Sequence, residues 1–193
     1  EILYKKVSEP KFRTLLPGFD ADYMPVDCKD DQLYYVTNEN ASNCALMKID
    51  LNRPAQIATV IPEDEKNLLE GVGSAGGYLF ASYLEDAQSR IRQYDYDGKL
   101  VRVVELPAIG TVGGFDREKE DAELYYTLTN YTSPATVYKY DIASGTSTLY
   151  KAPEVKFDPA QFTTEQVFFT SKDGTKVPMF ITYRKGLKRD GKN

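Results

Sequence analysis

The sequence predicts an all-β fold, a partial β-propeller of about three and a half four-stranded antiparallel blades followed by a β-hairpin. Three patterns predict it: an aromatic-rich strand, a strand that ends in aspartate and a strand that ends before proline all recur every 45 or 46 residues. Other repeats of this length, such as HEAT and armadillo, are helical. Here helical periodicity is suggested only around residues 63–69.

The aromatic-rich strand is the clearest element of each unit. It occupies residues 32–38, 78–83 and 123–130. The leucines of these segments, Leu33, Leu79 and Leu124, are separated by 46 and 45 residues. We therefore expect equivalent strands in three successive blades.

The strand that follows alternates apolar and polar residues, which is typical of a strand with one buried face. It occupies residues 46–50, 91–95 and 137–141, and its closing aspartates are 45 and 46 residues apart. Asp97-Gly98 and Ser144-Gly145 come next in two of the units and favour hairpin turns. These segments give each unit its third strand and a turn into the fourth.

Prolines close the outermost strand of each unit, because proline cannot donate to a strand ladder. They are Pro17, Pro62, Pro107 and Pro153, at intervals of 45, 45 and 46 residues. The innermost strand is expected at residues 23–26, 71–75 and 111–115, where glycines suit the crowded channel of a propeller.

These registers divide the chain. Blades are predicted at residues 20–65, 66–109 and 110–155, after the outer strands of another blade in residues 1–19. Residues 156–193 form a linker and a hairpin that turns at residues 172–174. Because propellers close with roughly four to eight blades, we expect part of a ring of about seven or eight. The start without Met and the loop-like end also indicate a piece of a longer protein.

Composition excludes several classes of function. With 24 basic and 29 acidic residues, the chain carries no footprint for nucleic acid or for an anionic membrane, and we expect neither partner. The sequence contains no histidine, so Ser-His-Asp and Cys-His catalytic groups cannot be assembled from it, and the common zinc sites lose their usual ligand. We expect no cofactor.

Cys28 and Cys44 are expected on the first and third strands of one blade, about 9 to 10 Å apart, which is too far for a disulfide. We therefore expect free thiols. Free thiols favour a reducing compartment such as the cytoplasm, and the periplasm stays open as an alternative.

A resemblance to the prolyl oligopeptidase family rests on SKDGTKVPMFI at residues 171–181. In that family such a stretch leads from the last propeller blade into an α/β-hydrolase domain, which is missing here. Four further segments lie N-terminal to this stretch and occur in the same order as in the family. They are YYVTN at 34–38, IPEDEK at 61–66, SYLED at 82–86 and SPATVY at 133–138.

The resemblance implies a serine endopeptidase that hydrolyses bonds after proline in short peptides, with the propeller gating substrate access. Its partners would be the α/β-hydrolase domain of the same parent chain and an oligopeptide. None of the family's catalytic positions falls within these residues, so we expect no catalytic, cofactor-binding or metal-binding residue and an inactive fragment. We also expect the bare ends of the arc to self-associate. The alternative is a non-enzymatic propeller that binds protein or glycan.

Some residues could carry chemistry and are better explained otherwise. Asp95-Tyr96-Asp97-Gly98 resembles the start of a calcium loop but lacks the later acidic ligands, so a hairpin turn is favoured. Three acidic clusters are expected to be solvated loop charges. They are Asp20-Asp22, Asp27-Asp30-Asp31 and Glu118-Glu120-Asp121. The 15 tyrosines and 9 phenylalanines are expected to pack between blades. Ser133-Pro134 faces either the channel or the hydrolase domain, and the sequence does not choose.

Overall fold

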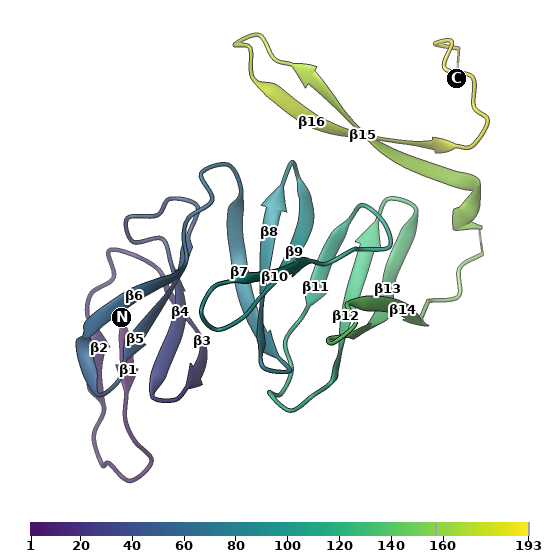
Figure 1. Ribbon diagram of the computed structural model, residues 1–193. Helices are drawn as coiled ribbons and strands as arrows, with labels where there is room; N and C mark the ends of the chain where they lie inside the picture. The colour runs from purple at the N-terminus through teal and green to yellow at the C-terminus, as the bar shows by residue number, and fades with distance from the viewer. Residues whose placement is uncertain (157, 193) are drawn as a thin grey trace.

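The computed structural model describes residues 1–156 and 158–192, and shows an arc of antiparallel sheets with a hairpin above it (Figure 1). The arc begins with a two-stranded sheet, the N-terminal ribbon, formed by β1 (Ile2–Tyr4) and β2 (Arg13–Leu16). Three four-stranded sheets follow, and in each of them the strands lie in sequence order. This is the arrangement of propeller blades, and it confirms the predicted fold class.

The strands of the three blades are as follows. The first blade holds β3 (Tyr23–Lys29), β4 (Gln32–Thr37), β5 (Ala45–Asp50) and β6 (Arg53–Ile61). The second holds β7 (Leu68–Ala75), β8 (Tyr78–Glu85), β9 (Gln88–Tyr94) and β10 (Leu100–Val103). The third holds β11 (Thr111–Gly114), β12 (Glu123–Asn130), β13 (Ser133–Asp141) and β14 (Thr146–Lys151).

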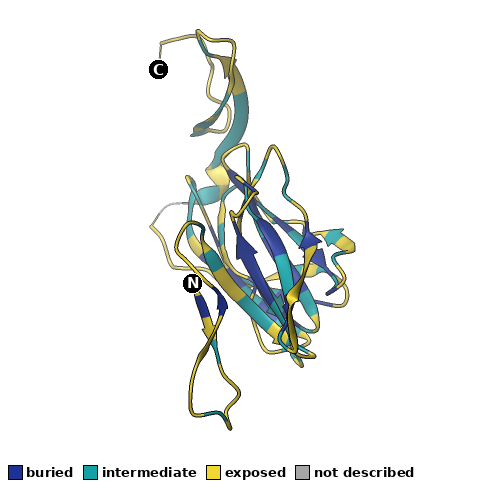
Figure 2. Cartoon of the chain, turned by 90° about the vertical axis from the view of Figure 1, so that its left-hand side faces the viewer, coloured by how far each residue is buried: buried dark blue, intermediate teal, exposed yellow. Residues whose placement is uncertain are grey.

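The hydrophobic core lies between the sheets, and the central strands are buried on both faces (Figure 2). On β4, Tyr34 and Val36 face the second blade whereas Tyr35 faces the N-terminal ribbon. On β8, Leu79 packs against the first blade and Phe80 against the third. This two-sided burial explains why the central strands read as nearly continuous apolar runs.

Aromatic rings fill the space between blades, as predicted. The fully buried ones include Tyr35, Phe80, Tyr83, Phe115, Tyr126 and Tyr140. Between the second and third blades, Phe80 meets Tyr140 edge-on with ring centroids 5.9 Å apart, and Phe115 stacks on Tyr126 at 4.7 Å. Offset-stacked and edge-to-face pairs of this kind are preferred geometries for aromatic side chains.

The hairpin follows a short 3-10 helix (Pro159–Gln161) capped by the Asp158 side chain. β15 (Phe162–Thr170) and β16 (Lys176–Arg184) pair along their whole length, and the turn falls at residues 171–175, as predicted. In Figure 1 the hairpin stands above the second and third blades, at one end of their strands.

Two details differ from the sequence interpretation. Residues 63–67 are not helical, because the Asp64 carboxylate accepts hydrogen bonds from the main-chain amides of Lys66 and Asn67 and closes a turn. Leu69 then lies in β7 and is buried in the core between blades. Cys44 is not on the third strand but precedes β5, with φ of 64°, so the expected placement of this thiol is wrong.

Candidate functional site

The arc has two faces, defined by the turns at the ends of its strands. The upper face carries the β4–β5 and β8–β9 turns and the β12–β13 turn, and the hairpin lies above it (Figure 1). The lower face carries the β3–β4 and β7–β8 turns and the β11–β12 loop. Contacts that join separate parts of the chain occur on both faces, so each is a candidate site.

On the upper face, Gln166 of β15 contacts the β8–β9 turn. Its Nε2 donates to the main-chain oxygen of Asp86 at 2.5 Å, and its Oε1 accepts from Gln88 Nε2 at 3.0 Å. Gln88 is only 7% exposed. One carboxamide therefore bridges a main-chain acceptor and a buried side-chain donor of the second blade.

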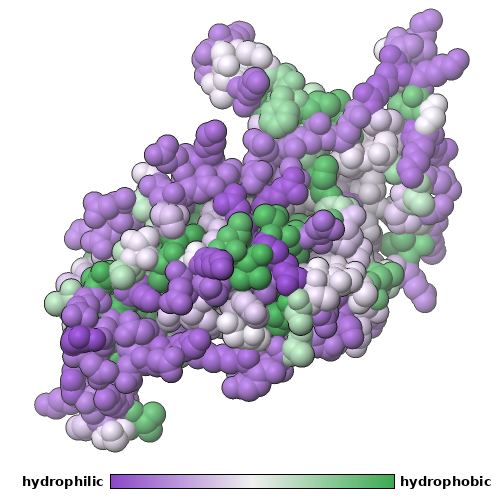
Figure 3. All heavy atoms as spheres, viewed as in Figure 1, coloured by the Kyte–Doolittle hydropathy of each residue, from purple (hydrophilic) through white to green (hydrophobic). Residues whose placement is uncertain are grey.

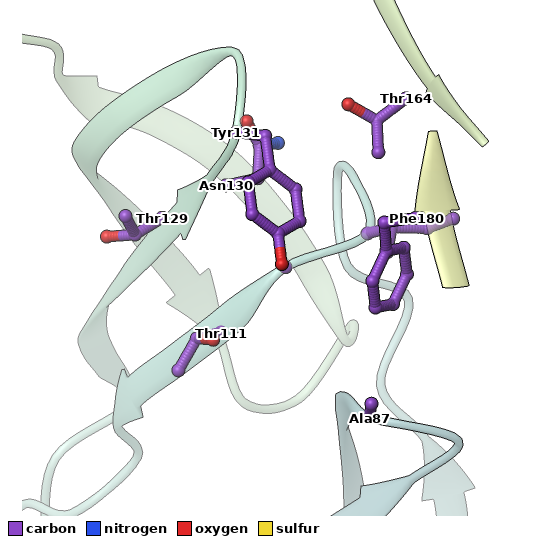
Figure 4. A pocket seen from close by; sticks show the side chains of 9 residues that line it. Ala87, Thr111, Thr129, Asn130, Tyr131, Thr164 and Phe180 are labelled. Atoms are coloured by element: carbon purple, nitrogen blue, oxygen red, sulfur yellow. The ribbon is translucent and has the colours of Figure 1, made fainter. Parts of the chain in front are cut away.

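A second contact joins the hairpin to the third blade. The rings of Tyr131, in the β12–β13 turn, and Phe180, on β16, have centroids 5.9 Å apart. Figure 4 shows these rings facing each other across a pocket of about 280 Å³. The remaining lining residues are Ala87, Ile109, Gly110, Thr111, Thr129, Asn130 and Thr164.

The pocket is lined by uncharged side chains. Its polar groups are threonine hydroxyls, the Asn130 amide and the Tyr131 hydroxyl, and no general base is placed beside them.

In residues 1–156 and 158–192, no group of three or more His, Cys, Asp or Glu side chains could hold a metal ion. Among the same residues, none forms a helix long and apolar enough to cross a membrane.

On the lower face, Asp27 joins three blades in what we call the clasp. Its carboxylate accepts from Tyr96 of the second blade and pairs with Lys119 Nζ, from the β11–β12 loop of the third, at 3.0 Å. Lys119 Nζ also donates to the main-chain oxygen of Cys28 at 2.7 Å. A polar cavity of about 730 Å³ lies beside these groups.

Electrostatics of the clasp follow from its burial. Desolvation raises the pKa of the Asp27 carboxyl, but hydrogen bonds from Tyr96 and Lys119 outweigh it, so the pKa lies below its ordinary value. For Tyr96, burial and then the hydrogen bond to Asp27 both raise the pKa of the hydroxyl. At neutral pH the clasp therefore holds an ionised carboxylate and a neutral phenol.

One acidic cluster is corrected here. Asp27 is not a solvated loop charge, because it lies in β3 and its side chain is 13% exposed. The other clusters do lie in loops: Asp22, for example, exchanges hydrogen bonds with Asn38 across the start of the first blade.

Two further predictions are confirmed. Asp95 accepts from the main-chain amides of Asp97 and Lys99, which makes the calcium-like segment a hairpin turn. Both cysteines are free.

Ser133-Pro134 opens β13, and Ser133 Oγ lies 3.4 Å from Thr136 Oγ1. Its neighbour Tyr131 is the residue that meets the hairpin. Sequence reasoning missed Gln88, Gln166 and the clasp, because neither glutamine belongs to a motif and the clasp residues are distant in the sequence.

Comparison with known proteins gives the same architecture. A family model for the N-terminal β-propeller domain of prolyl oligopeptidase matches residues 1–153. The prolyl endopeptidases of Elizabethkingia miricola and Elizabethkingia meningoseptica are 47% and 44% identical to the chain, and each match covers 94% of it and 26% of the relative.

A solved structure from a study of two prolyl endopeptidases and the role of inter-domain dynamics in their catalysis and specificity has a TM-score of 0.84. It is 37% identical over 97% of this chain and 28% of its own. The chain thus spans about a quarter of the length of the relatives it matches.

Proposed function

This chain belongs to the prolyl oligopeptidase family, through its N-terminal β-propeller domain, and on that premise we propose that it is the propeller segment of a serine endopeptidase. The parent enzyme hydrolyses peptide bonds after proline in short peptides. The propeller gates access of the substrate. The match of residues 1–153 to the family's propeller domain is the observation that carries this proposal.

The proposed domain organisation follows the repeat. Blades occupy residues 20–65, 66–109 and 110–155, and residues 1–19 supply the outer strands of a further blade. Residues 156–193 are the linker and the first hairpin of an α/β-hydrolase domain. The three four-stranded sheets and the separate hairpin sheet support this division.

The catalytic groups belong to the rest of the parent. A Ser-His-Asp triad needs an imidazole base, and these 193 residues contain no histidine. We therefore assign no catalytic, cofactor-binding or metal-binding residue to the chain, and expect it to be inactive alone. Its partners are the α/β-hydrolase domain, which the upper face meets through the hairpin, and an oligopeptide. A cavity roofed by a propeller admits short peptides and excludes folded proteins by size.

Cleavage of a chromogenic Gly-Pro substrate tests this function. We expect the longer protein that contains this sequence to cleave after proline and the 193-residue chain to be inert. A longer protein that cleaves nothing and has no G-x-S-x-G nucleophile motif would overturn the proposal in favour of a non-enzymatic binding platform. Rapid hydrolysis of large folded proteins by the longer protein would overturn the gating role.

Self-association of the isolated chain is part of the proposal. At one end of the arc, β14 of the third blade leaves Leu149 and Tyr150 exposed. In the middle of the arc, β10 leaves Leu100, Val101 and Val103 exposed, and hydrophobic atoms gather there in Figure 3, where β10 crosses the arc in Figure 1. Exposed apolar patches favour association. We expect sedimentation to show oligomers that grow with concentration, and a monodisperse monomer at high concentration would contradict this.

A further inference from the structure

Gln166 lies where its side chain can fix the position of the hairpin relative to the arc. The β8–β9 turn is a two-residue turn in which Asp86 and Ala87 have φ of 50° and 61°, the backbone of a type I′ hairpin. The Asp86 carbonyl accepts from Gln166 Nε2, and Gln88, the residue after the turn, donates to Gln166 Oε1. Donor and acceptor thus alternate along a chain of three groups, and the carboxamide at position 166 satisfies both neighbours, whereas a carboxylate would satisfy only Gln88.

Burial makes this bridge specific. Gln88 is 7% exposed, so its amide has little access to water, and breaking the bridge leaves a buried donor without this partner. Asp86, by contrast, contributes only its main-chain oxygen, which any residue would offer at that position. Specificity in the contact therefore resides in the Gln88 and Gln166 side chains.

The second contact between hairpin and arc, between Tyr131 and Phe180, is open to solvent. Tyr131 remains 72% exposed although it faces Phe180, and the pocket of about 280 Å³ separates the two parts beside this pair. Residues 152–156, which precede the hairpin, are exposed and form no strand. The glutamine bridge is therefore the specific polar contact by which β15 is fixed to the second blade.

We propose that Gln88 and Gln166 form a releasable latch that positions the hairpin, and whatever follows it in the parent chain, on the upper face of the propeller. Closed, the latch keeps the two parts together and limits the size of the peptides that enter between them. Open, it lets the hairpin move away from the arc, with residues 152–156 as the exposed segment before it. The consequence for peptide size rests on the proposed function, whereas the latch itself does not.

An isosteric substitution, Gln166→Glu, tests the latch. A carboxylate can still accept from Gln88 but cannot donate to the Asp86 carbonyl, which it repels. Gln56→Glu is the matched control, because Gln56 is exposed on β6 and the change adds the same charge without touching the contact.

The position of the hairpin is measured as the distance between two spin labels. One label is attached at Lys172→Cys in the hairpin turn and the other at Lys99→Cys in the second blade. Cys28 and Cys44 are first replaced by serine so that only these two sites are labelled. Both lysines are exposed. We expect the fraction of molecules with a displaced hairpin, the displaced population, to rise about fivefold in Gln166→Glu. This is the change expected from the loss of one hydrogen bond. In Gln56→Glu the displaced population should stay constant. If Gln166→Glu gives the same distance distribution as the chain with Gln166 intact, the latch is overturned.

A double-mutant cycle keeps the test decisive if one variant is poorly folded. Gln166→Ala should raise the displaced population more than Gln88→Ala, because Gln166 also donates to the Asp86 carbonyl, and the double variant should raise it no more than Gln166→Ala alone. Additive effects would mean that the two side chains act separately and would overturn the latch.

Activity of the longer protein gives the second readout. We expect Gln166→Glu to raise the ratio of the rates for a long and a short proline-containing peptide about fivefold, the change in displaced population. An unchanged ratio together with a displaced hairpin would overturn the size-limiting role. A longer protein without any peptidase activity would refute the proposed function, and the label distances would still decide the latch.

Discussion

The contacts between blades and the contact between hairpin and arc differ in kind. Blades meet through buried aromatic and aliphatic side chains such as Phe80 and Tyr140, with exposures of 0%. Among the described residues, the hairpin meets the arc through the bridging carboxamide of Gln166 and through Phe180, which faces the mostly exposed ring of Tyr131. Burial of apolar surface dominates stability, so the arc behaves as one body, and the hairpin is attached to it more weakly.

Removing a ring between blades should have the largest effect on stability. Phe80→Ala deletes a fully buried side chain that contacts Phe115 and Tyr140, and we expect the free energy of unfolding to fall by about 3–5 kcal/mol. Urea unfolding measures it. A loss below about 1 kcal/mol would mean that the blades are not joined by this core.

A methyl group at Gly98 should have the next largest effect. Gly98 has φ of +82°, and a Cβ there would lie 1.9 Å from the Val60 main-chain oxygen of the first blade. We expect Gly98→Ala to cost about 2–4 kcal/mol, measured by thermal unfolding. Gly77→Ala is the control, because Gly77 has a similar φ of +78° and open space, and should cost about 1 kcal/mol. Equal costs would contradict the importance of this close approach.

The clasp should contribute less and should depend on pH. Asp27→Asn removes the charge that Lys119 pairs with, and we expect a loss of about 1–2 kcal/mol at neutral pH. Because the pKa of Asp27 is lowered in the folded state, its stabilisation is present above the ordinary aspartate value of about 3.9 and is lost as pH falls through the folded-state pKa. Urea unfolding from neutral to acidic pH should show the free energies of unfolding of the unsubstituted chain and of Asp27→Asn converging. A difference that stays constant with pH would contradict this ionisation.

Tyr131→Ala should have the smallest effect. The ring is 72% exposed and faces Phe180 of the hairpin, so we expect the free energy of unfolding to change by less than about 0.5 kcal/mol. The spin-label distance to the hairpin should nevertheless broaden. A large loss of stability would show that the hairpin is part of the cooperative core.

The sequence reveals the arc better than it reveals the sites, and the reason is physical. Repetition of Leu33, Leu79 and Leu124 reflects strands buried on both faces, which leave a periodic apolar pattern. The clasp joins residues 69 and 92 positions apart, and the pairing of Asp27 with Lys119 depends on how the blades are stacked. Residues 63–67 are not helical because a single side chain, Asp64, turns the backbone, and a periodic apolar pattern does not reveal such a local contact.

The clasp also constrains how such a chain can change in evolution. In repeat proteins each unit contacts its neighbours, so a unit can be gained or lost with little disturbance. Lys119 instead reaches past the second blade to Asp27 in the first. Duplication or deletion of the second blade would separate these partners or crowd them, so the number of repeats between them is fixed unless the β11–β12 loop changes as well.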